Sequence, residues 1–464
     1  MGLARAMAGK TIVKGERAQV YALFAIVMLA GALGNLSQTA VNAMMPDILA
    51  EFGIDVGLGQ WLTTSYMLVL GITVPVATFF SRRFSVRRHV LVALALFCAG
   101  ALLDSAATSF WMLLSGRVLQ AVSAGLLMPL MQTIAMTRFP MDRRSTAMGI
   151  AGIAMGFAPN IGPTIGGAMV FSFGWRSFFY LLLALMLLLV VAAVLCIASG
   201  RAADGGAKLD LVSLMQSSLG FGGLLLAFSN ASSFGLASAL IWVPLAVGAL
   251  FLVLFVRRQK RVDDPLIDMS IFESRQFTSG FMALNFLHAS FMGITLVIPL
   301  YIEGLCGGTS LDAGIVLLPG TLAALFLNPI SGALVDRIGI RPVVMVSGVL
   351  LAIGSIIMVF VDESTPLYMT TIFQAIRAFG VSGLMAPLIS WSLADLPRST
   401  VTDGSSFCIA VRQACASLGT STMVFAITVV SATAAAPALA YQIAFAFSAV
   451  FAVLTFAYIV VRVK

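Results

Sequence analysis

Repeated runs of apolar residues constrain this chain more than any other feature. An α-helix needs about 20 apolar residues to cross a bilayer, because only a helix or a closed barrel satisfies its backbone groups inside lipid. Breaking the 464 residues at polar and charged clusters gives fourteen such runs. They lie at 19–45, 58–80, 89–107, 110–136, 146–171, 177–198, 210–229, 237–256, 277–301, 311–334, 343–361, 366–392, 404–430 and 437–461. We therefore expect an all-α integral membrane protein with 14 transmembrane helices.

The balance of residue types also indicates a membrane protein rather than a soluble one. The chain is 60% hydrophobic and 10% charged, and its mean hydropathy is +1.03. A soluble domain needs about a quarter of its residues charged to cover its surface. The longest polar stretch, from about 257 to 278, is too short to form a soluble domain. We expect the lipid bilayer to surround nearly the whole chain.

The sequence carries no pattern typical of an enzyme or of a nucleic-acid-binding protein. Its two histidines, His89 and His288, cannot build a metal site, and its five cysteines lack metal-binding or redox spacing. Neither a nucleophile triad nor a phosphate-binding loop occurs in the sequence. Basic cytoplasmic loops explain the net charge of +8 better than a nucleic-acid partner does. We expect no catalytic activity, no cofactor, no metal and no nucleic-acid partner.

The positions of the basic residues predict the orientation of the spans. With the N-terminus inside the cell, only Arg176 of the 27 lysines and arginines lies in an outer loop. Three more, Arg117, Arg377 and Arg412, fall within spans, and the others lie in inner segments. The first apolar run is too long for a cleaved signal peptide, so we expect it to remain. We expect a multi-pass protein of the cell membrane with both termini in the cytoplasm.

An internal repeat divides the spans into two groups. The fourth span contains GRVLQAVSAGLLMPL (116–130) and the twelfth contains IRAFGVSGLMAPL (376–388). Both are followed by similar inner loops, which read RRST and PRST. The repeat predicts two pseudo-symmetric halves of six helices, at 1–200 and 263–464, with two inserted helices at 201–262. Repeated halves that enclose a central site are a design of transporters.

The stretch APNIGPTIGG (158–167) places helix breakers inside the fifth apolar run. Small residues at i, i+4 and i+8 form a flat stripe against which another helix can pack closely. Two prolines bend the helix by removing hydrogen bonds. Two interpretations remain: a general packing groove, or a hinge that seals the cavity on one side. The residues concerned are Ala158, Pro159, Gly162, Pro163, Gly166 and Gly167.

The first span carries a polar face on an otherwise apolar helix. Its members are Asn35, Gln38, Thr39 and Asn42, at i, i+3, i+4 and i+7. Amides and hydroxyls in lipid would lack partners, so this face should line an interior cavity that holds the substrate. Hydrogen bonding between helices is an alternative that explains the same pattern, and both interpretations can hold together.

Arginines within the spans need a partner, because a charge at the bilayer centre costs about 2.5–3.5 kcal/mol or more. Arg117 is followed one turn later by Gln120, and Arg377 is its counterpart in the second half. Arg117 either governs the protonation of a nearby carboxylate or pins helices by donating to backbone carbonyls. We place Gln120 and Arg377 in the cavity lining. Arg412 lies nearer the inner face, where a structural role is sufficient.

No acidic residue lies at a clear midplane position. Asp104, Glu303 and Asp312 lie at outer span ends, where Asp104 and Arg117 flank one short turn. His288 lies near the middle of its span, with Asn285 one turn before it. Because its pKa is near neutrality, His288 is the best titrating group at the midplane, although a lone histidine is more often a packing residue. These four titratable residues join Arg117 as candidates for proton coupling, and Asn285 joins the cavity lining.

The inner loop after the tenth span carries an adjacent acid and base, Asp336 and Arg337. We expect this pair to act as a gate clasp between helices rather than to contact substrate. Elsewhere the cavity should be apolar. The 24 methionines and 33 phenylalanines supply soft side chains suited to varied amphiphilic cargo.

Motifs along nearly the whole chain resemble those of the major facilitator superfamily. RVLQAVSAGLLMPL (117–130) is similar to the fourth-helix motif of that family, and APNIGPTIGG to the fifth-helix antiporter motif. Further segments resemble its fourteen-helix drug:proton antiporters, in particular the lincomycin-resistance type: LSQTAVNAMMPDI (36–48), QWLTTSYML (60–68), PVATFFSRRFSVRRHVL (75–91), ALVDRIGIRP (333–342) and RQACASLGTS (412–421). The chain departs from the family pattern at Arg82 and Ser85 in the first-half loop motif, and at Ser37, where many relatives carry an acid.

The resemblance implies a bacterial, monomeric antiporter that exports amphiphilic drugs or toxic small molecules in exchange for protons. It also favours the hinge-and-seal interpretation of residues 158–167. The alternative is a dedicated exporter of a single metabolite or lipid-like molecule, with coupling to protons or to another driving force.

Overall fold

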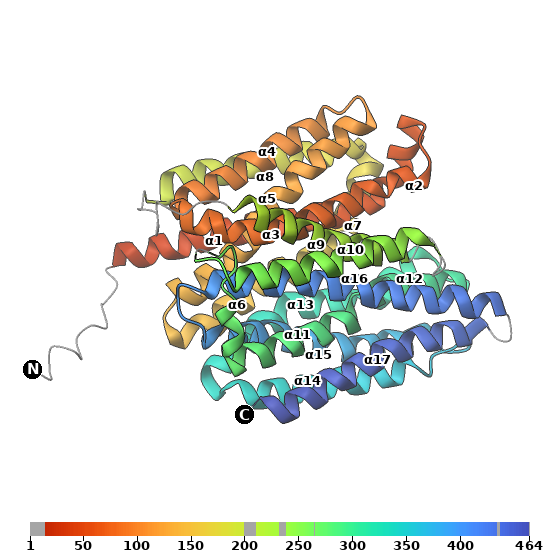
Figure 1. Cartoon of the computed structure of the whole chain (residues 1–464). Helices are drawn as coiled ribbons and strands as arrows, with labels where there is room; N and C mark the ends of the chain where they lie inside the picture. Colours follow the sequence, from red (N-terminus) through yellow and green to blue (C-terminus); the bar gives the residue numbers. More distant parts are fainter. Residues whose placement is uncertain (1–13, 199–209, 232–237, 264, 434–436, 464) are drawn as a thin grey trace, which may run out of the picture.

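The computed structural model describes residues 14–198, 210–231, 238–263, 265–433 and 437–463, and these residues form long helices that run roughly along one direction (Figure 1). Thirteen helical stretches within the described residues are long and apolar enough to cross a membrane. The expected fifth span is the fourteenth, broken into shorter pieces. The structure therefore confirms the all-α membrane fold expected from the sequence.

The first half contains the six spans before residue 198. Its elements are α1 Lys14–Phe52, α2 Val56–Gly59, α3 Trp61–Arg83, α4 Val86–Ser105, α5 Phe110–Arg138, η1 Met141–Arg143, α6 Arg144–Gly152, η2 Ile153–Phe157, α7 Ala158–Phe173 and α8 Trp175–Cys196. Together α6, the π-helical η2 and α7 make up the fifth span. Serine side chains cap two of these helices: Ser85 accepts from the Arg88 N–H and Ser109 from the Met112 N–H.

The second half contains the last six spans. Its elements are η3 Met269–Glu273, α11 Arg275–Phe291, α12 Ile294–Gly304, α13 Ser310–Ile338, α14 Ile340–Met358, α15 Leu367–Ala394, α16 Val401–Thr433 and α17 Pro437–Arg462. The ninth span consists of α11 and α12, which meet at Met292 and Gly293. The turn from α13 to α14 is made by Gly339, whose φ of +84° suits a residue without a side chain.

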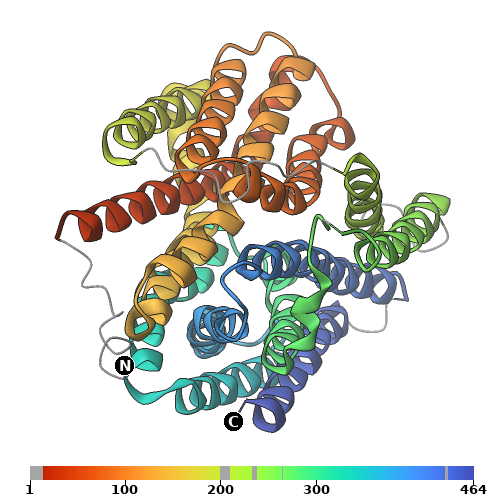
Figure 2. The same cartoon turned by 60° about the vertical axis from the view of Figure 1, so that its left-hand side comes forward.

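The two halves lie side by side (Figure 2) and repeat the same local packing. In the first half α4 crosses α5 so closely that a Cβ on Gly100 would lie 2.5 Å from the Gly116 carbonyl oxygen. In the second half α14 crosses α15 in the same way, and a Cβ on Gly354 would lie 2.5 Å from the Arg377 nitrogen. Small residues allow this approach of backbones, which supplies packing energy in lipid. The sequence repeat is therefore a structural repeat.

The inserted helices α9 Leu211–Ala231 and α10 Ala239–Gln259 pack against each other, and α9 also packs against α3 and α16. They thus touch both halves at one edge of the molecule (Figure 2). Arg258 donates to the Asp210 carboxylate at 2.7 and 3.1 Å and lowers the pKa of Asp210 to about 2. The pair therefore stays ionised at physiological pH. The expected boundary at 200–201 lies outside the described residues, and the boundary at 262–263 follows the end of α10.

Candidate functional site

A buried polar network joins four helices of the first half. Gln120 donates to Asp104 Oδ2 at 2.8 Å through Nε2, and its Oε1 accepts from Arg117 Nη1 at 2.9 Å. Arg117 Nη1 also donates to Ser37 Oγ at 2.6 Å, and Ser37 donates to Gln120 Oε1 at 2.7 Å. The Arg117 guanidinium lies 4.4 Å from the centre of the Tyr66 ring. All five side chains are fully buried, so we name Ser37, Tyr66, Asp104, Arg117 and Gln120 the acid–arginine network.

The niche that holds Asp104 depends on a glycine. A Cβ on Gly116 would overlap Asp104 Oδ1, so any residue with a side chain at this position would displace the carboxylate. Asp104 Oδ1 has no hydrogen-bond partner among the described residues, nor have Arg117 Nε and Nη2. The sequence places Asp104 at the end of its span. The structure adds that the carboxylate points into the bundle and shares Gln120 with Arg117.

The second half repeats the arginine but not the acid. Arg377 donates to the Ser290 carbonyl oxygen at 3.1 Å and to Gln374 Oε1 at 3.4 Å. Gly354 corresponds to Gly100 in the repeated crossing, and four residues later the second half carries Met358 where the first half carries Asp104. Met358 is buried. The halves are therefore alike in packing and different in charge.

Two side chains of the polar face of α1 bind carbonyls that prolines leave free. In the π-helical η2 each carbonyl pairs with the N–H five residues later, as in the bond from the Ala158 N–H to Ile153. Pro159 and Pro163 have no N–H, so the carbonyls of Ala154 and Pro159 lose their partners within the helix. Asn35 donates to the Ala154 oxygen at 2.9 Å, and Thr39 donates to the Pro159 oxygen at 2.7 Å.

The other two members of the polar face point elsewhere. Asn42 is exposed and accepts a hydrogen bond from Thr63 on α3 at 2.8 Å. Gln38 is buried. Hydrogen bonding between helices, the alternative to cavity lining, therefore accounts for three of the four side chains.

The expected glycine stripe of the fifth span packs against α1. A Cβ on Gly162 would lie 2.7 Å from the Leu36 carbonyl oxygen and would overlap the Thr39 hydroxyl, and a Cβ on Gly166 would lie 2.8 Å from the Ala40 oxygen. Gly167 has ordinary space, because its Cβ would be 3.8 Å from Ala43. The stripe thus fastens the broken fifth span within the first half.

A second stripe of glycines, which the sequence analysis does not predict, joins the two halves. Gly149, Gly152 and Gly156 on the first part of the fifth span face Asn328 on α13. A Cβ on Gly149 would lie 2.4 Å from the Asn328 carbonyl oxygen, and the Asn328 side chain donates to the Gly152 oxygen at 2.9 Å. The spacing of these glycines is visible in the sequence, but the helix that they face is not.

We call the end of the bundle where α1 begins and α17 ends the terminal face, and its other end the opposite face (Figure 1). Asp336, at the end of α13, accepts from the N–H groups of Ser145 at 3.2 Å and Thr146 at 2.7 Å. Its Oδ2 also accepts from the Thr146 hydroxyl at 2.6 Å. Asp336 thus caps α6 of the other half at this face, where free N–H groups and the helix dipole favour an anion. Arg337 is exposed and takes no part in this contact.

The related contact between α3 and α16 has the opposite polarity. Arg82, at the end of α3, donates to Asp403 Oδ2 at 2.5 Å, and Asp403 is fully buried in the first turn of α16. Arg82 also donates to the Pro265 oxygen at 2.9 Å, and Asp403 accepts from the Asp268 N–H at 2.9 Å. Here the basic residue, Arg82, lies at the end of α3, and the acidic residue, Asp403, lies on α16 of the other half. We call this contact and the Asp336 cap the two clasps.

The hydrogen bonds that join the halves within the described residues lie towards the terminal face. Besides those of the clasps and of Asn328, they link Thr78 with Ser406, Gln132 with Ser405, Thr133 with Thr402 and Ser145 with Ser390. The structure therefore has its halves fastened together at the terminal face.

The remaining proton-coupling candidates lie in different surroundings. His288 is buried on α11, with Nδ1 2.8 Å from the Leu284 oxygen, and Asn285 is buried one turn before it. Glu303 is exposed near the end of α12. Asp312 forms a capping box with Thr309 at the start of α13. None of these four residues contributes to the acid–arginine network.

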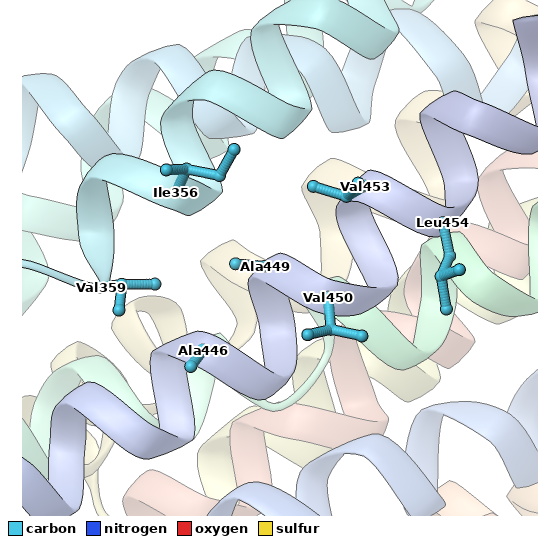
Figure 3. A pocket seen from close by; sticks show the side chains of 7 residues that line it. All are labelled: Ile356, Val359, Ala446, Ala449, Val450, Val453 and Leu454. Carbon is cyan, nitrogen blue, oxygen red and sulfur yellow. The ribbon is translucent and has the colours of Figure 1, made fainter.

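An apolar pocket of about 360 Å³ lies between α14 and α17 (Figure 3). Seven aliphatic side chains line it, from Ile356 and Val359 on α14 to Leu454 on α17. Several of them are exposed on the outside of the bundle, where lipid chains would cover them. This pocket is separate from the candidate site. No group of residues that could hold a metal ion occurs within the described ranges.

Comparisons with known proteins agree with this architecture. The family model of the Major Facilitator Superfamily matches residues 27–420. The chain is 32% identical over 399 residues to the uncharacterized MFS-type transporter YcnB of Bacillus subtilis (strain 168), covering 86% of this chain and 84% of that protein. It is 31% identical over 418 residues to the lincomycin resistance protein LmrB of Listeria monocytogenes (serovar 1/2a, strain ATCC BAA-679 / EGD-e), covering 90% and 88%.

Two other transporters are also similar to this chain. The riboflavin transporter RibZ of Clostridioides difficile (strain 630) is 26% identical over 403 residues, which cover 87% of each chain. The crystal structure of the transporter FucP in the outward conformation superposes with a TM-score of 0.61 at 14% identity, covering 93% of this chain and 98% of that chain. This superposition shows the same fold.

Proposed function

Because this chain belongs to the major facilitator superfamily, a family of membrane transporters rather than enzymes, we propose that it is a proton-coupled exporter of amphiphilic small molecules. Transport proceeds by alternating access, in which the two halves rock about a central site. The relation to a lincomycin resistance protein supports drugs or toxic compounds as cargo. The transporter is a monomer in a bacterial cell membrane.

The observation that carries the proton coupling is the acid–arginine network. Removing a carboxylate from water is costly unless a positive charge or hydrogen bonds compensate. Gln120 links Asp104 to Arg117, and one Asp104 oxygen is left without a partner. Asp104 can therefore exist as an anion held by Arg117 or as a neutral acid. It lies in the last turn of α4, near the opposite face, so we assign it as the group that takes up the proton.

The network also connects the proposed proton site to α1 and, through α1, to the fifth span. Arg117 holds Ser37 of α1, and the neighbouring residues Asn35 and Thr39 hold the proline-freed carbonyls of the fifth span. Protonation of Asp104 removes the negative charge nearest to Arg117, and this changes the strength of the hydrogen bond from Arg117 to Ser37 of α1. The fifth span then bends at its π segment and prolines, where helix hydrogen bonds are already missing.

The basic inner loops support a cytoplasmic terminal face. The two clasps and the stripe of Gly149, Gly152 and Gly156 then close the cytoplasmic side, and we assign the structure to the state open towards the outside. In this assignment Asp104 takes its proton from the outer side, the direction in which a proton gradient drives export.

The carrier assignment is tested with Asp104→Asn in proteoliposomes that carry an imposed pH gradient. This variant keeps the shape of the side chain and cannot bind the proton. We expect it to abolish gradient-driven export of a fluorescent amphiphile while leaving its binding to the purified protein within about threefold. Glu303→Gln and Asp312→Asn, outside the network, are matched controls and should keep gradient-driven export. If export by Asp104→Asn still depends fully on the pH gradient, Asp104 is excluded as the proton carrier and His288 becomes the favoured candidate.

A dedicated exporter of one metabolite is the second candidate, and the relation to a riboflavin transporter favours it. A panel of unrelated amphiphiles separates the two. The drug exporter should dissipate a pH gradient in everted vesicles with several of them. A dedicated exporter should respond to none or to one.

A further inference from the structure

The second half holds a buried arginine without a counter-ion. Arg412 on α16 is 7% exposed, and its Nη1 is buried without a partner. Within the described residues Arg412 takes part in neither a hydrogen bond nor an ion pair. It lies about 16 Å along α16 from Val401, at 1.5 Å per residue, in the part of the helix nearer the terminal face. A cation at such a depth needs a negative charge or water beside it.

The helix that lies beside Arg412, α11, carries polar residues at this level but no acid. Gly404 and Gly419 of α16 meet Phe277 and Ala289 of α11, so α11 lies beside α16 along this stretch. Asn285 therefore lies at the level of Arg412, and its Oδ1 has no hydrogen-bond partner. His288 lies one turn after Asn285 on the same helix and is also buried.

Neither Asp403 nor Arg377, the other buried charged residues described in the second half, is a free counter-ion for Arg412. Asp403, the acid on the same helix, is bound by Arg82 and by the Asp268 N–H. Arg377 rests on the Ser290 carbonyl. In the first half Arg117 has Asp104 within its network, whereas Arg412 has no comparable acid. The second half therefore has an excess of positive charge in its interior.

We propose that Arg412, with Asn285 and His288 beside it, is the subsite for a negatively charged group of the cargo, such as a carboxylate. A guanidinium forms strong charge-assisted hydrogen bonds with a carboxylate, often in pairs, and the Asn285 amide can add another. This assignment rests on the proposed export of amphiphiles and narrows the substrate class to those that carry an anionic group. A cargo carboxylate and a lipid headgroup offer the same chemistry at this site.

The test measures binding to the purified protein in neutral phosphatidylcholine nanodiscs, with no proton gradient. Carboxyfluorescein and rhodamine 123 are the probes, because they share a xanthene ring and differ in charge. We expect the native protein to bind carboxyfluorescein at least about tenfold more tightly. Arg412→Gln should remove that preference by weakening carboxyfluorescein binding about tenfold or more, since a charge-assisted bond is worth over 1.4 kcal/mol. Arg412→Lys, which keeps the charge, should retain most of the preference.

Arg398→Gln is the control, because it removes the same charge from an exposed position of the second half. It should leave both probes unaffected. If Arg412→Gln does not yield folded protein, competition on the native protein replaces it: decanoate should displace carboxyfluorescein and decylamine should not. Anionic phosphatidylglycerol should not displace the probe. Displacement by that lipid would overturn the cargo assignment in favour of a headgroup site.

A native protein with no preference for the anionic probe would overturn the proposal. So would an Arg412→Gln variant that binds both probes as the native protein does, or that weakens both equally. Because no gradient is applied, these outcomes are independent of the Asp104 test of proton coupling.

Discussion

Single glycines decide whether the fifth span can lie on α1. Gly162 and Gly167 belong to the same ten-residue stretch, but only Gly162 has α1 backbone within 3 Å of the place that a Cβ would take. Pattern alone does not separate them, because both are small residues in one motif. The structure separates them by the space around each.

Gly162→Ala should therefore be damaging and Gly167→Ala tolerated. The added Cβ on Gly162 would overlap the Thr39 hydroxyl and crowd the Leu36 oxygen, which should cost about 1–3 kcal/mol of stability. Export should fall at least tenfold, and Gly162→Leu should stop it. Thermal unfolding and vesicle transport of both variants provide the check. Equal behaviour of the two alanine variants would contradict the assigned contact.

Thr39 should be needed for its hydroxyl more than for its shape. Thr39→Val removes the donor to the Pro159 oxygen and leaves a partly buried carbonyl unpaired, which costs about 1 kcal/mol or more. Thr39→Ser keeps the donor and should behave as the native protein. The melting temperatures of the two variants provide the measurement. If Thr39→Val is as stable as Thr39→Ser, this hydrogen bond does not hold the fifth span.

The depth of a residue along a span could be inferred from the sequence, but the direction of its side chain could not. Asp104 was placed correctly at a span end. Its burial depends on Gly116, which lies on the next helix and opens the niche. Arg412 shows the same limit, because its lack of an acidic partner depends on which helix packs beside α16. Hydrogen bonding between helices, which Asn35 and Thr39 make, is one of the two alternatives that the sequence leaves open, but the sequence does not identify the proline-freed carbonyls as the partners.

At the scale of whole elements, the apolar runs of the sequence predict the positions of the spans well and the breaks within a span less well. The run 19–45 became α1, which extends to Lys14–Phe52 because charged residues near both ends can lie outside the hydrocarbon region. The fifth run contains the π segment η2, which no periodicity indicated. Breakers in the sequence predicted a bend there, but its exact form depends on the partners that α1 supplies.

The two clasps at the terminal face join helices that lie far apart in the sequence. Arg82, one of the departures from the family's loop motif, is explained by its ion pair with Asp403 on α16. The sequence separates these residues by more than 300 positions, so their pairing could not be read from it. Asp336 and Arg337 are expected to clasp helices together, and Asp336 does contact Ser145 and Thr146 of the other half, whereas Arg337 is exposed and takes no part.

A charge swap should test the clasp between α3 and α16. Arg82→Asp or Asp403→Arg alone places like charges together and should weaken closure of the terminal face by about 3 kcal/mol. The double variant restores opposite charges and should recover much of the closure and transport. Labelling of cysteines introduced at this face reports its opening. Arg83→Asp, at an exposed neighbouring position, is the control and should have little effect.

A double variant no better than the worse single variant would show that Arg82 and Asp403 act independently. Recovery confined to expression level would give the same answer, since the expected recovery is in closure.

At the scale of the molecule, the internal repeat predicted the two halves, and the structure shows what the repeat could not. Of the inserted helices, α9 packs against α3 and α16, one from each half. The same two helices carry the clasp of Arg82 and Asp403. A relative movement of the halves must therefore shear the inserted pair or carry it along.

The central claim is that the halves rock, so that one face opens as the other closes. Two spin-label pairs placed on a background without native cysteines test it by pulsed electron spin resonance. Met141 and Arg337 report on the terminal face, and Phe173 and Phe360, which are 79% and 75% exposed, report on the opposite face. Each pair joins the first half to the second.

Changing the pH or adding cargo should lengthen the distance across the terminal face and shorten the distance across the opposite face. Distances that stay fixed under every condition, or that lengthen together, would contradict alternating access in this protein.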